Sequence, residues 1–127
     1  MTESRNINIS ISKDQLAELP IVYYSGQISV IDTIDTAKSA IHFINNQSIV
    51  GFDTETRPSF RKGKSNNVSL VQISTLNHSF LFRINKLGFI DELKSLLENP
   101  NITKIGLSLK DDFNGAINYF KNINFFA

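Results

Sequence analysis

The sequence predicts an α/β fold in which a mixed β-sheet is flanked by helices. Two observations predict it. Three apolar runs of strand length follow one another in the middle of the chain, and segments with apolar residues at helical spacing lie before and after them. A run of strands followed by alternating helices and strands is typical of a mixed sheet that helices cover.

Each element follows from the spacing of apolar residues and from the residues that cap or break it. Ser12 and Gln15 have the spacing of a capping box, which predicts a short helix ending at Pro20. Apolar residues every three or four positions predict helices, and compact apolar runs bounded by polar residues predict strands. The remaining elements are a strand at 27–31, a helix at 33–45, strands at 49–54, 68–75 and 79–84, a helix at 87–97, a strand at 103–107 and a helix at 112–120.

Nothing in the chain indicates a second domain, because it has no repeat, no low-complexity tract and no Gly/Ser-rich linker. Residues 124–127 form an apolar, strand-like end with no evident partner and no closing helix, and its exposure would be costly. We therefore expect residues 1–127 to be one partial domain whose C-terminal part is missing. Residues 1–26 are expected to be an N-terminal extension that includes the short helix.

The composition excludes several classes of function. The chain has no cysteine, which excludes disulfides, thiolate metal sites and cysteine nucleophiles and agrees with a cytoplasmic protein. It contains no Gly-rich phosphate loop and no nucleophile elbow. No apolar run approaches the roughly 18 residues of a membrane span, so we expect no membrane partner. The net charge of +1 neither requires nor excludes a nucleic acid.

A pair of carboxylates stands where the apolar run at 49–54 ends. Asp53 and Glu55 are two residues apart, so in a strand their side chains point to the same face. Two such charges repel unless a cation lies between them, and Mg²⁺ prefers oxygen ligands of this kind. The alternative is a strand end that runs into a polar turn, since Asp-x-Glu is a common pattern.

A second acidic pair, Asp111 and Asp112, follows the predicted strand at 103–107 and opens the predicted helix at 112–120. Aspartate at a helix start also caps free backbone N–H groups and suits the helix dipole. This pair alone therefore leaves helix capping and metal binding both open.

Taken together, the two acidic segments resemble a known family. Residues 49–60 (IVGFDTETRPSF) resemble the first motif of the DEDD 3′–5′ exonucleases of the ribonuclease D and Werner-exonuclease branch. Residues 104–113 (KIGLSLKDDF) resemble the second motif, in which a glycine precedes the catalytic aspartate by six positions, and Gly106 thereby selects Asp112. The strands at 68–75 and 79–84 resemble the two that lie between these motifs.

The resemblance implies a ribonuclease H-like fold and removal of nucleotides from single-stranded DNA or RNA 3′ ends, with two Mg²⁺ or Mn²⁺ ions held by four carboxylates. Asp53 would bridge both ions, Glu55 would bind the one that activates water, and Asp112 would support the second. The third motif of the family, a Tyr or His followed four residues later by Asp, should lie well downstream of residues 120–127 and is absent. Tyr119 is followed at that distance by Ile123 and comes too soon after the second motif to replace it. We therefore expect impaired activity.

The segment after the first motif carries four cations and an aromatic ring close to the expected metal site. Such a loop can bind backbone phosphates and stack on a base, although it can equally be a solvated connection. Its candidate nucleic-acid-binding residues are Arg57, Phe60, Arg61, Lys62 and Lys64.

Two other functions stay open. The chain could bind nucleic acid without turnover, or it could be a protein-interaction module that pairs or self-associates through its unfinished C-terminal sheet edge. The two histidines, His42 and His78, have no partner at metal-ligand spacing and are expected on the surface.

Overall fold

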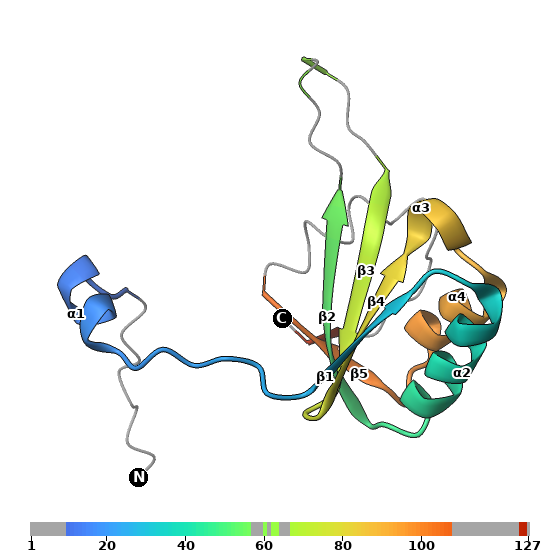
Figure 1. Ribbon diagram of the computed structural model, residues 1–127, viewed down its shortest axis with the longest axis horizontal. Helices are drawn as coiled ribbons and strands as arrows, with labels where there is room; N and C mark the ends of the chain where they lie inside the picture. The colour runs from blue at the N-terminus through green and yellow to red at the C-terminus, as the bar shows by residue number, and fades with distance from the viewer. Residues whose placement is uncertain (1–9, 57–59, 61, 64–66, 108–124, 127) are drawn as a thin grey trace, which may run out of the picture.

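A computed structural model describes residues 10–56, 60, 62–63, 67–107 and 125–126, and it shows a mixed β-sheet covered by helices (Figure 1). The described residues form six strands in the spatial order β1-β4-β3-β2-β5-β6, of which β3 runs against the others. The strands are β1 (Gln27–Ile31), β2 (Ile49–Thr56), β3 (Val68–Ser74), β4 (His78–Arg83), β5 (Thr103–Ile105) and β6 (Phe125–Phe126).

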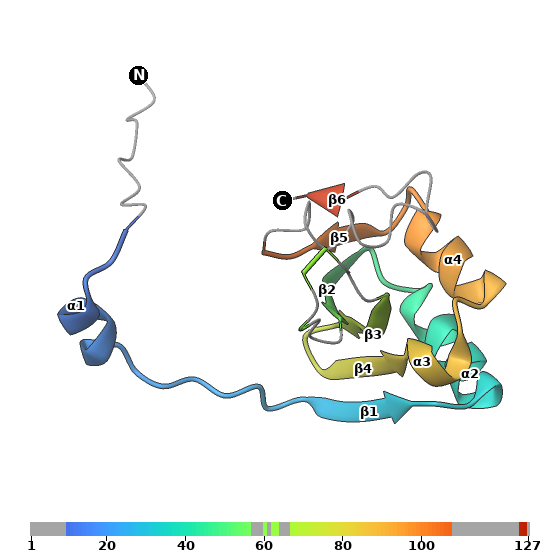
Figure 2. The ribbon, with the colours of Figure 1, turned by 90° about the horizontal axis from the view of Figure 1, so that it is seen from above.

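Three helices lie together on one side of the sheet (Figure 2). They are α2 (Ile34–Ile44), α3 (Ile84–Leu87) and α4 (Asp91–Glu98). The chain passes from β1 to β2 through α2, and from β4 to β5 through α3 and α4, and each crossover joins parallel strands. Because such crossovers are right-handed and both advance in the same direction across the sheet, their helices must cover the same face.

The core lies between this face and the helices. Along β2, Val50, Phe52 and Thr54 are buried, whereas Asp53 and Glu55 are exposed, as the two-residue period of a strand requires. The buried hydrophobic residues are Ile31, Ala37, Ala40, Ile41, Ile44, Val50, Phe52, Val68, Val71, Ile73, Phe80, Phe82, Ile84, Leu93, Leu96, Leu97 and Ile102. Each large side chain among them contributes about 1.5–3 kcal/mol through burial. The core therefore fixes one face of β2, and the side chains on the other face of the strand point to solvent.

Most of the predicted elements are present, with ends shifted by a few residues. The helix predicted at 33–45 is confirmed as α2, with Thr33 as its N-cap: the Thr33 hydroxyl accepts from the N–H of Thr36 at 3.3 Å. The strand predicted at 49–54 extends to Thr56. The strand at 103–107 ends earlier, at Ile105. The helix predicted at 112–120 lies outside the described residues.

The single helix predicted at 87–97 is wrong. The structure has two helices there, α3 and α4, separated by residues 88–90. Gly88 follows α3 with φ 68°, in the left-handed region that glycine adopts without strain, and this ends the helix. Ile90 still packs against the core, although it precedes α4.

The expectation that the apolar end at 124–127 has no partner is also wrong. Residues Phe125–Phe126 form β6, which pairs in parallel with β5, so that Lys104 lies opposite Phe125 and Ile105 opposite Phe126. β6 is therefore one end of the described sheet and β1 is the other.

Residues 10–26 form an N-terminal arm that leaves the sheet at β1. It contains α1 (Lys13–Glu18), whose capping box is formed as predicted: Ser12 and Gln15 each accept the other's backbone N–H, at 3.1 and 3.2 Å. No residue of α1 is buried, and Figure 1 shows the arm standing clear of the helices and the sheet. Among the described residues, none of the helices has the length and apolar character needed to cross a bilayer.

Candidate active site

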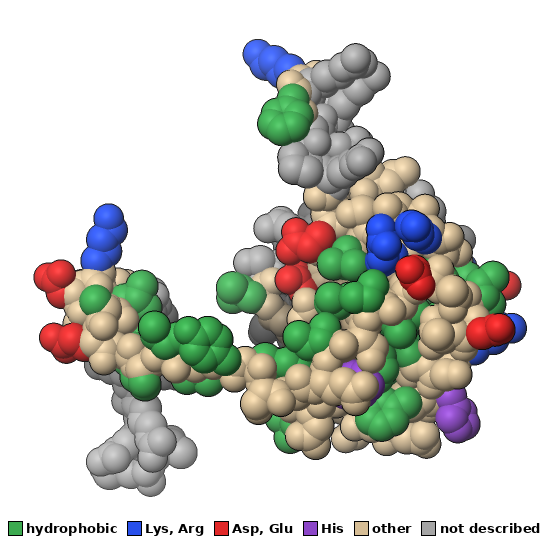
Figure 3. Space-filling model, viewed as in Figure 1, with side chains coloured by type: hydrophobic (Ala, Val, Ile, Leu, Met, Phe, Trp, Pro, Cys, Tyr) green, Lys and Arg blue, Asp and Glu red, His purple; other side chains and the backbone are tan. Residues whose placement is uncertain are grey.

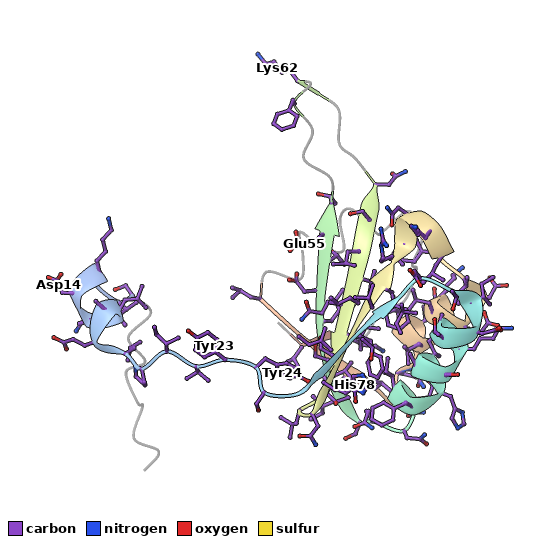
Figure 4. All side chains as sticks on the ribbon, viewed as in Figure 1. Asp14, Tyr23, Tyr24, Glu55, Lys62 and His78 are labelled. Carbon is purple, nitrogen blue, oxygen red and sulfur yellow. The ribbon has the colours of Figure 1, made fainter. Side chains whose placement is uncertain are left out.

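The acidic pair predicted from the sequence lies on the face of the sheet opposite the helices. Asp53 and Glu55 are alternate residues of β2 and both are exposed (Figure 4 labels Glu55). β2 is paired with β3 on one side and β5 on the other, so the backbone beneath the two carboxylates is fixed from both sides. Figure 3 shows acidic side chains gathered on this part of the surface, beside hydrophobic ones.

A backbone hydrogen bond orients Asp53. Its Oδ1 accepts from the N–H of Thr54 at 2.9 Å. Because the neighbouring Thr54 side chain is buried on the helix side, this N–H is itself held in place. One oxygen of Asp53 is thus fixed relative to the strand, as a preorganised ligand requires.

A β-bulge lies at Glu55. The pairing of β2 with β3 shifts here, since Glu55 lies opposite Leu70 whereas Thr56 lies opposite Val68, which leaves Ser69 as the extra residue. The Ser69 hydroxyl donates to the carbonyl oxygen of Glu55 at 3.1 Å and anchors the irregularity. Bulges increase the local twist and re-aim side chains, and they are common beside active sites.

The β3 residues opposite the pair are one polar and one apolar residue, Gln72 and Leu70. Gln72 lies directly opposite Asp53, is exposed, and donates through Nε2 to the Ser74 hydroxyl at 3.3 Å. On the far edge of the same face, Arg83 and Asp32 approach to 3.9 Å. The carboxylates therefore face solvent beside both apolar and hydrogen-bonding groups, and their exposure suits a hydrated hard cation.

The remaining predicted ligand, Asp112, lies outside the described residues, so its approach to Asp53 and Glu55 stays a prediction. Within the described part of the chain, no three His, Asp or Glu side chains are close enough to form a metal site. The two exposed carboxylates on one face fit a divalent cation by their chemistry.

The candidate nucleic-acid loop is described only at its tip. Phe60 is 98% exposed and Lys62 is exposed, and Figure 4 shows Lys62 far out from the sheet, beyond the end of β2 that carries Glu55. Arg57, Arg61 and Lys64 lie outside the described residues.

The structure places the two histidines differently. His42 is exposed on α2, as predicted. The surface expectation for His78 is wrong: it begins β4, is half-buried, and its Nε2 lies 2.7 Å from the Ser29 hydroxyl. Its ring stacks on Phe80 with 4.0 Å between the ring centroids, and this packing indicates a structural role.

Lys104 is a buried charge within the apolar strand that the sequence predicts at 103–107. It lies opposite Val50 on the helix side of the sheet, is 1% exposed, and donates through Nζ to the Asn99 carbonyl at 2.7 Å. Burial lowers the pKa of its ammonium group to about 8. No signal in the sequence distinguishes it from a surface lysine, because its burial depends on the distant strand β2.

Comparison with known proteins bears on the family and the fold. A family model described as 3′–5′ exonuclease matches residues 28–123. The chain is 33% identical over 79 residues to the predicted 3′–5′ exonuclease R431 of Acanthamoeba polyphaga mimivirus, covering 61% of this chain and 19% of that protein. It is 34% identical over 71 residues to the bifunctional 3′–5′ exonuclease/ATP-dependent helicase WRN of Mus musculus, covering 54% of this chain and 5% of that protein.

The solved structure of Trypanosoma brucei RNase D superimposes with a TM-score of 0.71 and 21% identity, over 80% of this chain and 38% of that one. This likeness shows the ribonuclease H-like fold. The chain thus spans well under half the length of these three proteins. Because the family model covers most of its residues, the chain belongs to the 3′–5′ exonuclease family.

Proposed function

We propose that this chain supplies the acidic half of a metal-dependent site that hydrolyses phosphodiester bonds at the 3′ end of DNA or RNA. One observation carries the proposal: Asp53 and Glu55 project together from the exposed face of a central strand in a member of the 3′–5′ exonuclease family. The family match begins at residue 28, which supports treating residues 1–26 as an extension of a partial catalytic domain.

Asp53 and Glu55 are the residues that would hold Mg²⁺ or Mn²⁺, and Asp112 is the proposed third ligand. A pair of bound divalent ions would supply a hydroxide nucleophile at neutral pH and stabilise the leaving 3′ oxygen. The chain itself contributes orientation: Thr54 holds one oxygen of Asp53, and the bulge at Ser69 sets the direction of Glu55. Together these contacts keep the two charges on one face of the strand.

The loop after β2 is the proposed contact for the nucleic acid. Phe60 presents an open ring for stacking on a base, and Lys62 presents a charge for the phosphate backbone. Arg57, Arg61 and Lys64 would add to that charge. Trypanosoma brucei RNase D has been solved in complex with RNA U12, which supports a nucleic-acid substrate for this fold.

Two weaker alternatives accompany this proposal. One is binding of nucleic acid without turnover, which is supported by the fact that no Tyr or His in these 127 residues is followed four residues later by Asp. Self-association through the C-terminal edge is supported by the position of β6 at one end of the described sheet. A cytoplasmic location stays a prediction from the absence of cysteine.

A labelled single-stranded oligonucleotide incubated with Mn²⁺ tests the proposed function. We expect slow shortening from the 3′ end by the 127-residue chain and no shortening by Asp53→Ala. A matched control, Asp91→Ala, removes an exposed carboxylate on α4 and should retain the wild-type rate. Salt-sensitive binding with no shortening would favour the non-catalytic alternative, and neither binding nor shortening would contradict both.

A further inference from the structure

A hollow of about 390 Å³ lies on the face of the sheet that carries the acidic pair. Side chains from β1, β3 and β4 line it, together with one tyrosine of the N-terminal arm. The lining residues are Tyr24, Ile28, Gln72, Ser74, Ser79 and Leu81. Its volume lies within the range of pockets that take small ligands, roughly 300–1,000 Å³.

The register of the strands places this hollow beside Asp53. Gln72 lies opposite Asp53 on β2 and opposite Leu81 on β4, and such cross-strand partners share a face of the sheet. Because adjacent strands lie about 4.7–4.9 Å apart, Gln72 and Leu81 are about 5 and 10 Å from the strand of Asp53. A phosphodiester bond at the carboxylates would therefore have the hollow within the length of one nucleotide.

The lining combines apolar walls with neutral hydrogen-bonding groups. Ile28 and Leu81 supply aliphatic surface, and Ile28 is 58% exposed. The hydroxyls of Ser74 and Ser79 share a hydrogen bond of 2.7 Å, and Gln72 Nε2 donates to Ser74 at 3.3 Å. Among the described residues that line the hollow, none is a Lys, Arg, Asp or Glu. This chemistry matches a neutral, flat ring with a hydrogen-bonding edge, and it does not match a phosphate, which binds to cations.

Tyr24 is fixed at one side of the hollow. Its hydroxyl donates to the Thr75 carbonyl at 3.4 Å. Gly26 gives the ring its space, because a Cβ there would overlap the Tyr24 side chain and the Asn77 carbonyl. Tyr24 is still 45% exposed, whereas the adjacent Tyr23 is 80% exposed and does not line the hollow (Figure 4 labels both). The arm therefore holds one aromatic ring at the hollow and leaves the other in solvent.

We propose that this hollow is the nucleobase subsite of the site on β2. The proposal rests on the proposed function: with the phosphodiester bond at Asp53 and Glu55, the base of the terminal nucleotide enters the hollow. The base lies against the Tyr24 ring and the aliphatic walls, and its edge hydrogen-bonds to the Gln72 amide. Because an amide carries both donors and an acceptor, the subsite accepts more than one base.

Amide chemical shifts of the isotope-labelled chain in Mg²⁺ test the location without any turnover. The probes are adenosine monophosphate and ribose 5-phosphate, which carries the sugar and phosphate but no base. We expect adenosine monophosphate to shift the amide signals of Ile28, Gln72 and Ser79, and ribose 5-phosphate to leave them unchanged. Equal shifts with both probes would overturn the proposal, as would shifts confined to residues away from the hollow or no shift at all.

Affinity for a labelled single-stranded oligonucleotide supplies a second readout. Tyr24→Leu should weaken binding about tenfold, the order expected for the loss of one contact between a base and an aromatic ring. Tyr23→Leu, which changes the adjacent tyrosine outside the hollow, is the matched control and should bind as the wild type does. The difference between the two variants should disappear on an oligonucleotide whose 3′-terminal nucleotide lacks its base.

Equal affinity of the two variants for the intact oligonucleotide contradicts the subsite. A defect of Tyr24→Leu that persists without the terminal base contradicts it as well. Metal-dependent shortening and its loss in Asp53→Ala are measured separately, so the two proposals fail separately. Shortening without a base-dependent shift at the hollow overturns the subsite alone, and a base-dependent shift without shortening supports the base-binding hollow and counts against hydrolysis.

Discussion

At the scale of single residues, charged side chains are exposed on one face of the sheet, whereas one is buried on the other. Asp53 and Glu55 keep their charges in solvent, whereas Lys104 carries its ammonium group into the layer between sheet and helices. The Asn99 carbonyl accepts from it, yet burial still lowers the pKa of Lys104 to about 8 from 10.5. A basic group whose folded pKa lies below its unfolded pKa destabilises the fold while it is charged.

This gives a prediction for the dependence of stability on pH. Between pH 8 and 10.5 the unfolded chain binds more protons than the folded chain, so the free energy of unfolding should rise with pH across that window. Below pH 8 the full cost of burial is present, on the order of 1–3 kcal/mol. Lys104→Met should therefore be more stable than the wild type at pH 7, and the difference should shrink toward pH 10.

Urea unfolding at pH 7, 8.5 and 9.5 measures the difference. Lys94→Met, which changes an exposed lysine on α4, is the control and should show a difference from the wild type that is independent of pH. A Lys104→Met variant that is less stable than the wild type at every pH would show that the bond to Asn99 outweighs the cost of burial.

At the scale of elements, the spacing of apolar residues predicts burial well, but it does not predict whether a helix is continuous. Leu87, Ile90, Leu93 and Leu97 have helical spacing and all contact the core or lie within it. The helix is nevertheless interrupted, because Gly88 adopts a positive φ and the chain is extended at Ile90. The spacing of apolar residues therefore indicates which side chains are buried. A short turn between two helices can keep those side chains buried although the helix is interrupted.

Gly88 is therefore the residue whose replacement tests the break between α3 and α4. Gly88→Ala places a Cβ on a backbone at φ 68°, which should cost about 1 kcal/mol of stability or more, although nothing lies within 4 Å of the new atom. Thermal unfolding followed by circular dichroism measures it. The control is Ser95→Ala, an exposed change to a stronger helix former within α4. Equal stability of Gly88→Ala and the wild type would show that the turn relaxes without strain.

At the scale of the whole molecule, the sequence was sufficient for the fold class, for the order of most elements and for the shared face of Asp53 and Glu55. All three depend on local patterns: apolar spacing, caps and the two-residue period of a strand. The pairing of β6 with β5 and the burial of Lys104 could not be predicted, because each depends on which strands become neighbours in space. The same holds for the hollow beside Gln72, which exists only once the strand order is known.

The central claim is that Asp53 and Glu55 hold a divalent cation on the exposed face of β2, and a calorimetric titration with Mn²⁺ tests it most directly. We expect the wild type to bind and Asp53→Asn to bind about 10–100-fold more weakly, because loss of a metal ligand or its supporting shell commonly has that effect. Asp91→Asn, with the same change of charge on α4, should bind as the wild type does. Equal affinity of the wild type and Asp53→Asn for Mn²⁺ would contradict the account.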